Sequence, residues 1–343
     1  MVISDFDYTL PEQLIAQQPA DKRERSRMLV VDRATGSVSD KHFLDLPDLL
    51  RKDDVLVLNN TKVFPARLYG KSDTGANVET FLVKEIIENV WEALARPGKR
   101  LKVGKKIIFS DQLSAIVIEK NEDGKVIIKF DTEGDLNTII DELGQTPLPP
   151  YIKRNNGVID TDRERYQTVY ASKRGAIAAP TAGLHFTPET LSEVKQRGVV
   201  VVEITLHVGY GTFEPIRVDD LAQHSVLSER YEIDADTAHM LNKAKSDGRR
   251  IVGIGTTTTR ALESNLVEFD SFFPGRHTAG LTIIPGYRFQ AIDALLTNFH
   301  LPKSSLLVLV SVFGGHELIM DAYRHAVAEH YRFYSYGDCM FIE

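Results

Sequence analysis

The sequence is poor in the features that mark disulfide-rich, metal-binding and membrane proteins. It has one cysteine, Cys339, in 343 residues, which excludes an internal disulfide and any Cys-x-x-Cys metal site. The longest apolar run, near Leu306 to Phe313, is far shorter than the roughly 20 residues that span a bilayer. The acidic start lacks the charged-then-apolar pattern of a signal peptide, so we expect a cytoplasmic protein that makes no membrane contact.

Three ligand-binding patterns are also missing. There is no Gly-x-x-x-x-Gly-Lys-Ser/Thr loop, and no Gly-x-Gly-x-x-Gly follows the first expected strand, which disfavours nucleoside triphosphates and dinucleotides as ligands. His-x-x-x-His spacing is absent from the loop regions. We therefore predict neither a bound metal nor a bound cofactor.

Net positive charge is lacking as well. The formal charge is −7, which argues against a protein coated by nucleic acid. Basic residues still gather in two stretches, one from Arg96 to Lys106 without any acidic residue and one at Lys22, Arg23, Arg25 and Arg27. Each stretch favours a focused contact with phosphates, and the alternative for each is a solvated surface. The candidates for RNA contact in the first stretch are Arg96, Lys99, Arg100, Lys102, Lys105 and Lys106.

What is present is an alternation of buried strands and helices, which indicates an α/β fold. Runs of aliphatic and β-branched residues predict strands at 28–32, 54–60, 199–208 and 250–255. We expect the segments 155–165 and 269–280 to be loops and the segment 281–284 to be a strand.

Between residues 67 and 146 the expected secondary structure changes to short strands separated by turn residues. Glu122-Asp123-Gly124 is a strong hairpin signal, and no helix is expected before Leu136 to Leu143. We therefore predict a barrel-like α/β domain formed by residues 1–66 and 147–343, interrupted by a smaller all-β antiparallel barrel domain at 67–146.

The segment Ala178 to Glu189 places a histidine, two threonines and a glycine in an otherwise apolar turn before a helix. Thr187 is a good N-cap and Pro188 suits the first helical position, which predicts a helix from Glu189 to Arg197. His185 in this turn is either a catalytic residue or a hydrogen-bonded core residue, and the same alternatives hold for His207.

Several of the expected strands end in polar loops. These ends are 59–62, 180–185, 207–212, 255–260, 298–300 and 336–338. If they meet on one rim, as strand ends do in barrels and doubly wound sheets, they form a ligand pocket. Thr256 to Thr259 at a helix start would offer backbone N–H groups to a carboxylate or phosphate, or would serve only to cap the helix.

The loops resemble those of one known family along the whole chain. The motifs that carry the resemblance are Asp5-Phe6-Asp7-Tyr8, Leu14 to Gln17, Ala179 to Phe186, Thr205 to Gly209, Gly255 to Thr257, Thr297 to Ser304 and Tyr331 to Phe333. They closely resemble the S-adenosylmethionine:tRNA ribosyltransferase-isomerases of queuosine biosynthesis. One departure is Leu227, at a position where the family usually has a histidine.

The resemblance implies an α/β domain interrupted by an antiparallel β-barrel, and an enzyme that uses S-adenosylmethionine as a ribosyl donor. The ribosyl group would be transferred to the 7-aminomethyl-7-deazaguanine at the wobble position of a tRNA with a GUN-type anticodon. Adenine and methionine would leave, and the product would be epoxyqueuosine. The implied partners are this tRNA and S-adenosylmethionine. We expect the protein to be a monomer.

The implied reaction needs a base beside the sulfonium, an acid for adenine departure and a partner for the cation. Histidine can take both proton roles near neutral pH, so the candidates are His185, His207 and His300, with Asp293 or Asp338 stabilising the cation or orienting a histidine. Which of them is base or acid stays open. The candidates for substrate binding are Thr181, Gly183, Gly209, Thr256, Thr257, Arg260, Asn298 and Arg332.

Two other functions fit the sequence less well. A methyltransferase that uses S-adenosylmethionine on RNA would need the glycine-rich first loop and acidic strand end of its usual fold, and both are absent. A noncatalytic RNA-binding protein would need basic residues interleaved with stacking aromatics, whereas the polar loops here are neutral and carry histidines.

Overall fold

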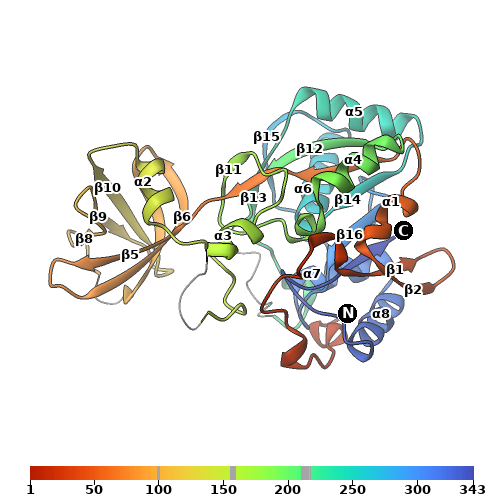
Figure 1. Cartoon of the computed structure of the whole chain (residues 1–343), viewed down its shortest axis with the longest axis horizontal. Coiled ribbons are helices and arrows are strands. Elements are labelled where there is room, and N and C mark those ends of the chain that lie inside the picture. The colour runs from red at the N-terminus through yellow and green to blue at the C-terminus, as the bar shows by residue number, and fades with distance from the viewer. Residues whose placement is uncertain (99–100, 155–159, 210–215, 217) are drawn as a thin grey trace.

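The larger part of the molecule is built on an open sheet of nine strands in the order β15-β13-β12-β3-β14-β16-β17-β1-β2 (Figure 1). The computed structural model describes residues 1–98, 101–154, 160–209, 216 and 218–343. The strands are β1 (Arg27–Asp32), β2 (Ser37–His42), β3 (Val55–Asn59), β12 (Val200–Leu206), β13 (Glu229–Ile233), β14 (Ile251–Ile254), β15 (Gly275–Ala279), β16 (Ala294–Asn298) and β17 (Cys339–Ile342). The four strands β12, β3, β14 and β16 are parallel neighbours, so their carboxyl ends lie on one edge of the sheet.

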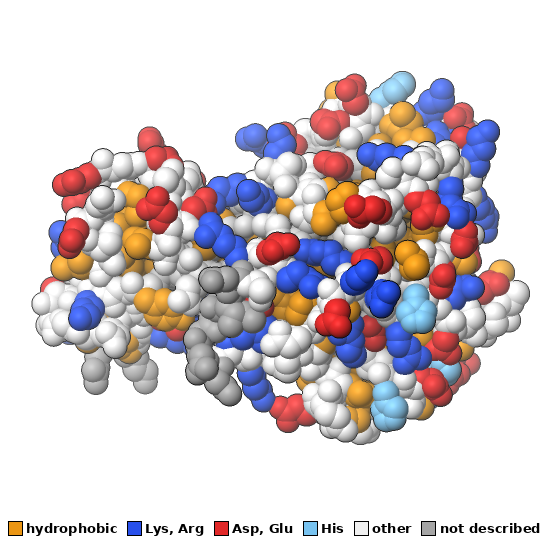
Figure 2. Space-filling model, viewed as in Figure 1, with side chains coloured by type: hydrophobic (Ala, Val, Ile, Leu, Met, Phe, Trp, Pro, Cys, Tyr) orange, Lys and Arg blue, Asp and Glu red, His pale blue; other side chains and the backbone are white. Residues whose placement is uncertain are grey.

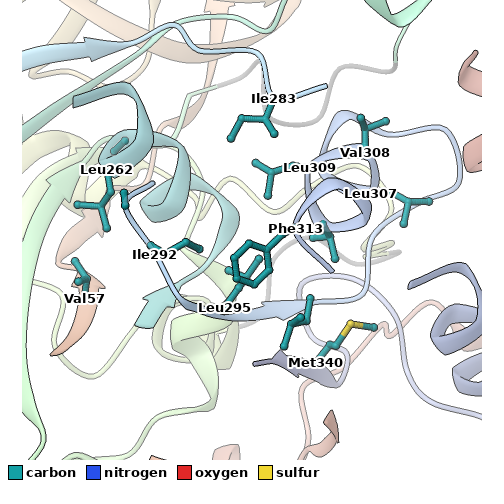
Figure 3. Packing of buried hydrophobic residues seen from close by; sticks show 14 of the residues in the cluster. Val57, Leu262, Ile283, Ile292, Leu295, Leu307, Val308, Leu309, Phe313 and Met340 are labelled. Atoms are coloured by element: carbon teal, nitrogen blue, oxygen red, sulfur yellow. The ribbon is translucent and has the colours of Figure 1, made fainter. Parts of the chain in front are cut away.

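Helices cover both faces of this sheet. They are α1 (Leu46–Leu49), α4 (Pro188–Gln196), α5 (Ala235–Ser246), α6 (Thr256–Phe269), α7 (Ser305–Gly314) and α8 (His316–Ala328). In β3, Val55 and Val57 pack in one core cluster with residues of α5 to α8, whereas Leu56 and Leu58 pack in another with residues of α1 and α4. Successive side chains of a strand point to opposite faces, so the continuous apolar run of β3 fills both layers. Figure 3 shows Leu262 of α6 and Leu309 of α7 in the first cluster.

The second part is a closed antiparallel barrel at one end of the molecule (Figure 1). Its strands are β5 (Arg67–Ser72), β6 (Asn77–Ile87), β7 (Val90–Arg96), β8 (Lys106–Ile108), β9 (Leu113–Lys120) and β10 (Val126–Thr132). They enclose a separate apolar cluster that includes Leu68, Trp91 and Ile128. Helix α2 (Leu136–Leu143) adds Ile139 and Ile140 to this cluster. The barrel therefore has a core of its own, and the predicted α/β class with an all-β barrel is confirmed.

Two adjacent crossings join the barrel to the larger part. The first follows β4 (Thr61–Val63), which pairs in parallel with β11 (Lys173–Ala176). The second returns through Gln145, whose backbone N–H donates to the carbonyl of Arg67 at 2.9 Å, while the N–H of Arg67 donates back at 3.3 Å. The two crossings are thus held side by side, and we call this region the neck.

Three local predictions were wrong. In the expected loop 155–165, Asp160–Arg165 form helix α3, while residues 155–159 lie outside the described residues. In the expected loop 269–280, Gly275–Ala279 form strand β15. The β15 sequence is too polar to predict a buried strand, but it lies at the sheet edge and gains its hydrogen bonds from β13. Residues 281–284 are not a strand, although Ile283 is buried, because they pack on the core and form no strand pairing with any described segment.

In the described part of the chain, no single helix is long and apolar enough to cross a membrane. Helices α7 and α8 reach that length and apolarity only as a pair, which is bent by 117°.

Candidate active site

A cavity of about 430 Å³ opens at the edge of the sheet where β14 and β16 end. We call it the ligand cavity. Its wall comes from the ends of strands and from loops far apart in sequence, namely 150–151, 179–182, 208, 255–257, 297–304, 306 and 334–335. The expectation that polar strand ends meet on one rim holds for the loops after β14 and β16, because these strands are parallel neighbours. A cavity of this size suits a small organic ligand.

Two helices begin at the ligand cavity. Helix α6 starts after Gly255, which has φ of 91°, a conformation that favours glycine, and Gly255, Thr256 and Thr257 all lie in the wall. Helix α7 starts after Ser304, whose side chain caps it by accepting from the N–H of Leu307 at 3.2 Å. The first turn of a helix has unsatisfied N–H groups and partial positive charge. These two helix starts can therefore bind a carboxylate, and Lys303 in the same wall is already ion-paired with Asp7.

His300 is the one predicted catalytic histidine that lies in the wall of the ligand cavity. Its Nε2 is 2.9 Å from Oγ1 of Thr297, and its backbone N–H donates to the hydroxyl of Tyr323 at 3.0 Å. Burial lowers the pKa of His300 from 6.5 to about 3. The ring is therefore neutral at pH 7, with one nitrogen that donates and one that accepts a hydrogen bond.

An aromatic pair forms another part of the wall. Tyr151 and Tyr334 lie with ring centroids 4.1 Å apart, and the Tyr151 hydroxyl is hydrogen-bonded to Ser335. Aromatic faces bind planar heterocycles by stacking and bind cations through the ring quadrupole. This wall could therefore hold either a purine or a sulfonium group.

His185 lies beneath the ligand cavity rather than in its wall. The side chain of Asn298 separates the two, since its Nδ2 is 3.3 Å from Nε2 of His185 and Asn298 itself lines the cavity. Burial, followed by the charges of Arg332 and Arg23, lowers the pKa of His185 to about 3. His185 is thus a neutral, buried ring that is hydrogen-bonded to Asn298.

The comparisons with known proteins agree on one family. The model of the queuosine biosynthesis protein family matches residues 3–342. The chain belongs to this family. It is also similar to a solved structure, the S-adenosylmethionine tRNA ribosyltransferase of Thermotoga maritima, at 36% sequence identity over 99% of this chain and 100% of that one, with a TM-score of 0.56. The family and the enzyme class expected from the sequence are therefore confirmed.

In this queuosine biosynthesis family member, three other predicted catalytic residues lie away from the ligand cavity. His207 follows β12, and its Nδ1 is 2.8 Å from the hydroxyl of Thr61; burial lowers its pKa. Asp293 accepts from the N–H of Ile251 at 2.8 Å, which places it at the opposite end of β14 and β16. The buried carboxylate of Asp338 accepts from the backbone N–H groups of Arg27 and Arg332, and the backbone carbonyl of Asp338 accepts from Nδ2 of Asn298 at 3.4 Å.

The predicted substrate-binding residues divide in the same way. Those in the wall of the ligand cavity are Thr181, Thr256, Thr257 and Asn298. Gly183 packs against Tyr170, and Arg332 is ion-paired with Asp338. Arg260 lines a small cavity on the far side of Thr256 and Thr257, where it is ion-paired with Glu229.

Three residues in the wall of the ligand cavity were not predicted, namely Tyr151, Tyr334 and Ser335. A tyrosine in a proline-rich connector or near the C-terminus has no local signal of ligand binding.

A larger cavity of about 580 Å³ lies between the barrel and the second crossing, and we call it the barrel-side cavity. Gly209 and Arg96 belong to its wall, and it shares Pro150 with the ligand cavity. The other predicted tRNA-binding residues follow Arg96 in the sequence, up to the start of β8, a strand that pairs with β5 and β9 rather than with β7. Lys102 and Lys106 are exposed, Lys105 is ion-paired with Asp73, and Lys99 and Arg100 lie outside the described residues.

The described residues contain no group of three or more histidine, cysteine, aspartate or glutamate side chains placed to hold a metal ion.

Proposed function

We propose that the ligand cavity binds S-adenosylmethionine and that His300 acts in the transfer of its ribosyl group. The acceptor is the 7-aminomethyl-7-deazaguanine at the wobble position of a tRNA with a GUN-type anticodon. The product is epoxyqueuosine in the tRNA, with release of adenine and methionine. The observation that carries this proposal is a neutral, cavity-lining histidine beside two helix starts and an aromatic wall.

The helix starts would hold the methionine part of the substrate. A carboxylate at the first turn of α6 meets the N–H groups of Thr256 and Thr257, where the helix dipole stabilises negative charge by about 0.3–1 kcal/mol or more when partly buried. Arg260 supports this turn from its other side and is already neutralised by Glu229. We therefore assign Arg260 to positioning rather than to direct contact.

His300 is assigned as the base that removes a proton from the carbon beside the sulfonium. The hydroxyl of Thr297 lies 3.3 Å from the backbone carbonyl of Asn298 and can donate to it. Nε2 of His300 then donates to Thr297 Oγ1, which leaves the lone pair on Nδ1 to accept the proton. The faces of Tyr151 and Tyr334 stabilise the sulfonium by about 0.5–2 kcal/mol. His185 and Asp338 position Asn298 in this scheme, and His207 and Asp293 take no chemical step.

The wobble nucleotide would reach the ligand cavity through the barrel-side cavity, since Pro150 lines both. Arg96 in its wall would contact a phosphate, and the basic residues from Lys99 to Lys106 would extend this contact along the stem. We propose that the protein works as a monomer in the cytoplasm, and size-exclusion chromatography with light scattering would test the oligomeric state.

Mass spectrometry of the products tests the function. An anticodon stem-loop that carries the precursor base is incubated with the protein and S-adenosylmethionine. We expect epoxyqueuosine in the RNA together with free adenine and methionine. Formation of S-adenosylhomocysteine and a methylated RNA would instead identify a methyltransferase and contradict the proposal.

A further inference from the structure

A third cavity, of about 340 Å³, lies at the neck beside the first crossing, and we call it the neck cavity. The chain segment Val63 to Pro65 forms part of its wall. Its charged wall residues are four basic and two acidic side chains, namely Arg23, Lys62, Arg163, Arg174, Asp141 and Glu164. On a protein with a formal charge of −7, an excess of positive charge in one cavity indicates an anionic ligand.

Two of these basic groups are not neutralised within the described part of the chain. Lys62 and Arg163 are exposed and have no ion-pair partner among the described residues. Arg174 is ion-paired with Asp141, and its guanidinium lies 4.9 Å from the ring centroid of Phe64, which fixes it in the wall. The neck cavity thus has one anchored guanidinium and two exposed cations that form no ion pair within the described residues.

Buried polar atoms in the wall point to the same kind of ligand. Nη2 of Arg174 and Oγ1 of Thr168 are buried and have no hydrogen-bond partner among the described residues, and both residues line the neck cavity. A buried polar group without a partner costs about 1–3 kcal/mol. Arg23 is crowded as well, because burial and then the charge of Arg165 lower its pKa. An anion that accepts hydrogen bonds would relieve both costs.

The position of the neck cavity favours an extended anion over a small one. Thr146 lines both the neck cavity and the barrel-side cavity, so the two flank the same crossing. Figure 2 shows Lys and Arg side chains at the neck and across the middle of the adjoining body. Lys22 and Arg25 are exposed and lie one and two residues from Arg23 of the cavity wall, so they extend the positive charge beyond the cavity. A polyanion that enters the barrel-side cavity can therefore continue over this surface.

We infer that the neck cavity binds backbone phosphates of the RNA substrate. This inference rests on the proposed function, because it places the RNA strand next to the nucleotide that reacts. The neck cavity would supply affinity and orientation without reading the base sequence, as phosphate contacts do. It is separate from the basic stretch Arg96 to Lys106, which connects β7 and β8 of the barrel.

The test is the salt dependence of binding between the full-length protein and an anticodon stem-loop, followed by fluorescence anisotropy. The variant is Lys62→Gln with Arg163→Gln. The matched control is Lys195→Gln with Lys243→Gln, which removes the same charge from exposed positions on α4 and α5. Each lost phosphate contact makes the negative slope of log K against log salt shallower by about 0.7 to 0.9. We therefore expect the magnitude of the slope to fall by roughly 1.4 to 1.8 in the variant and to stay unchanged in the control.

The outcomes separate this inference from the proposed function. Binding of S-adenosylmethionine, measured by calorimetry without RNA, should be equal in the wild type, the variant and the control. An unchanged salt slope in a variant that still binds S-adenosylmethionine overturns the inference alone. Absence of any RNA or S-adenosylmethionine binding by the wild type overturns the proposed function. Inorganic phosphate, titrated at constant ionic strength, tests the remaining source: if it binds at Lys62 and Arg163 while RNA binding is unaffected by the variant, the neck cavity is a site for free phosphate and the inference is wrong.

Discussion

The residue with the most direct consequence for the chemistry is His300. Replacing it by Gln removes the group that accepts a proton and keeps a side chain of similar length beside Thr297. A general base contributes about 10²–10⁴-fold in rate, so we expect kcat to fall by that factor while the affinity for S-adenosylmethionine changes little. The matched control is His239→Gln, at an exposed position on α5, which should leave kcat unchanged. A variant that keeps its rate per folded molecule would move the role of base to another residue.

Two buried histidines also determine how stability depends on pH. His185 and His300 both have a pKa of about 3 in the folded protein, against an ordinary value of 6.5. Between pH 3 and pH 6.5 these histidines are therefore protonated in the unfolded chain and neutral in the folded chain. Their contribution is fully present above pH 6.5 and is lost as the pH falls from 6.5 towards 3. Each histidine contributes a slope of about 1.4 kcal/mol per pH unit in that window.

Urea unfolding between pH 7 and pH 4.5 measures this slope. We expect the free energy of unfolding to fall with decreasing pH in the wild type and to fall less steeply in His185→Gln, because one titrating group is gone. An equal slope in the two proteins would show that His185 is protonated in the folded state. The pH dependence of kcat/KM gives a second test. Because His300 stays neutral down to about pH 3, its protonation should cause no loss of kcat/KM near pH 6.5.

At the scale of elements, the start of helix α6 depends on Gly255. Its φ of 91° is costly for residues with a Cβ, although a Cβ would lie an ordinary 3.7 Å from that of Ala182. We expect Gly255→Ala to lower the free energy of unfolding by about 1–3 kcal/mol and to raise the KM for S-adenosylmethionine, because the first turn of α6 must shift.

Gly248→Ala is the matched control for this prediction. Gly248 follows α5 with φ of 66°, and no atom lies within 4 Å of an added Cβ. The control should therefore lose a similar stability of about 1–2 kcal/mol and keep its KM for S-adenosylmethionine. Equal KM values in the two variants would show that the start of α6 does not bind the substrate.

At the scale of the whole molecule, the barrel has the closed strand order and the separate core of an independent folding unit. We expect residues 67–146, expressed alone, to unfold cooperatively on heating, as followed by circular dichroism. Phe64 and Ile177, which pack on this core from outside the segment, would be lost, so the isolated barrel should be less stable than the barrel in the full chain. A broad, noncooperative transition would contradict the proposed boundaries.

Much of the architecture was determined by local sequence. The aliphatic run of β3 predicts a strand buried on both faces, and Thr187 with Pro188 predicts the start of α4, where the Thr187 side chain accepts from the N–H of Thr190 at 3.1 Å. The turn residues between 67 and 146 likewise predict an all-β unit. These signals are strong because periodicity and capping act between residues a few positions apart.

The tertiary structure alone decided which polar groups share a cavity. His185, His207 and His300 have similar surroundings in the sequence, each among apolar residues near a strand or turn. They separate only when the sheet order places His207 beside Thr61, puts Asn298 between His185 and the ligand cavity, and brings His300 into the wall. Tyr151 joins that wall from a connector more than 140 residues before His300. Contacts over such separations depend on strand order and side-chain direction, which are set by the packing of the whole core rather than by any local pattern.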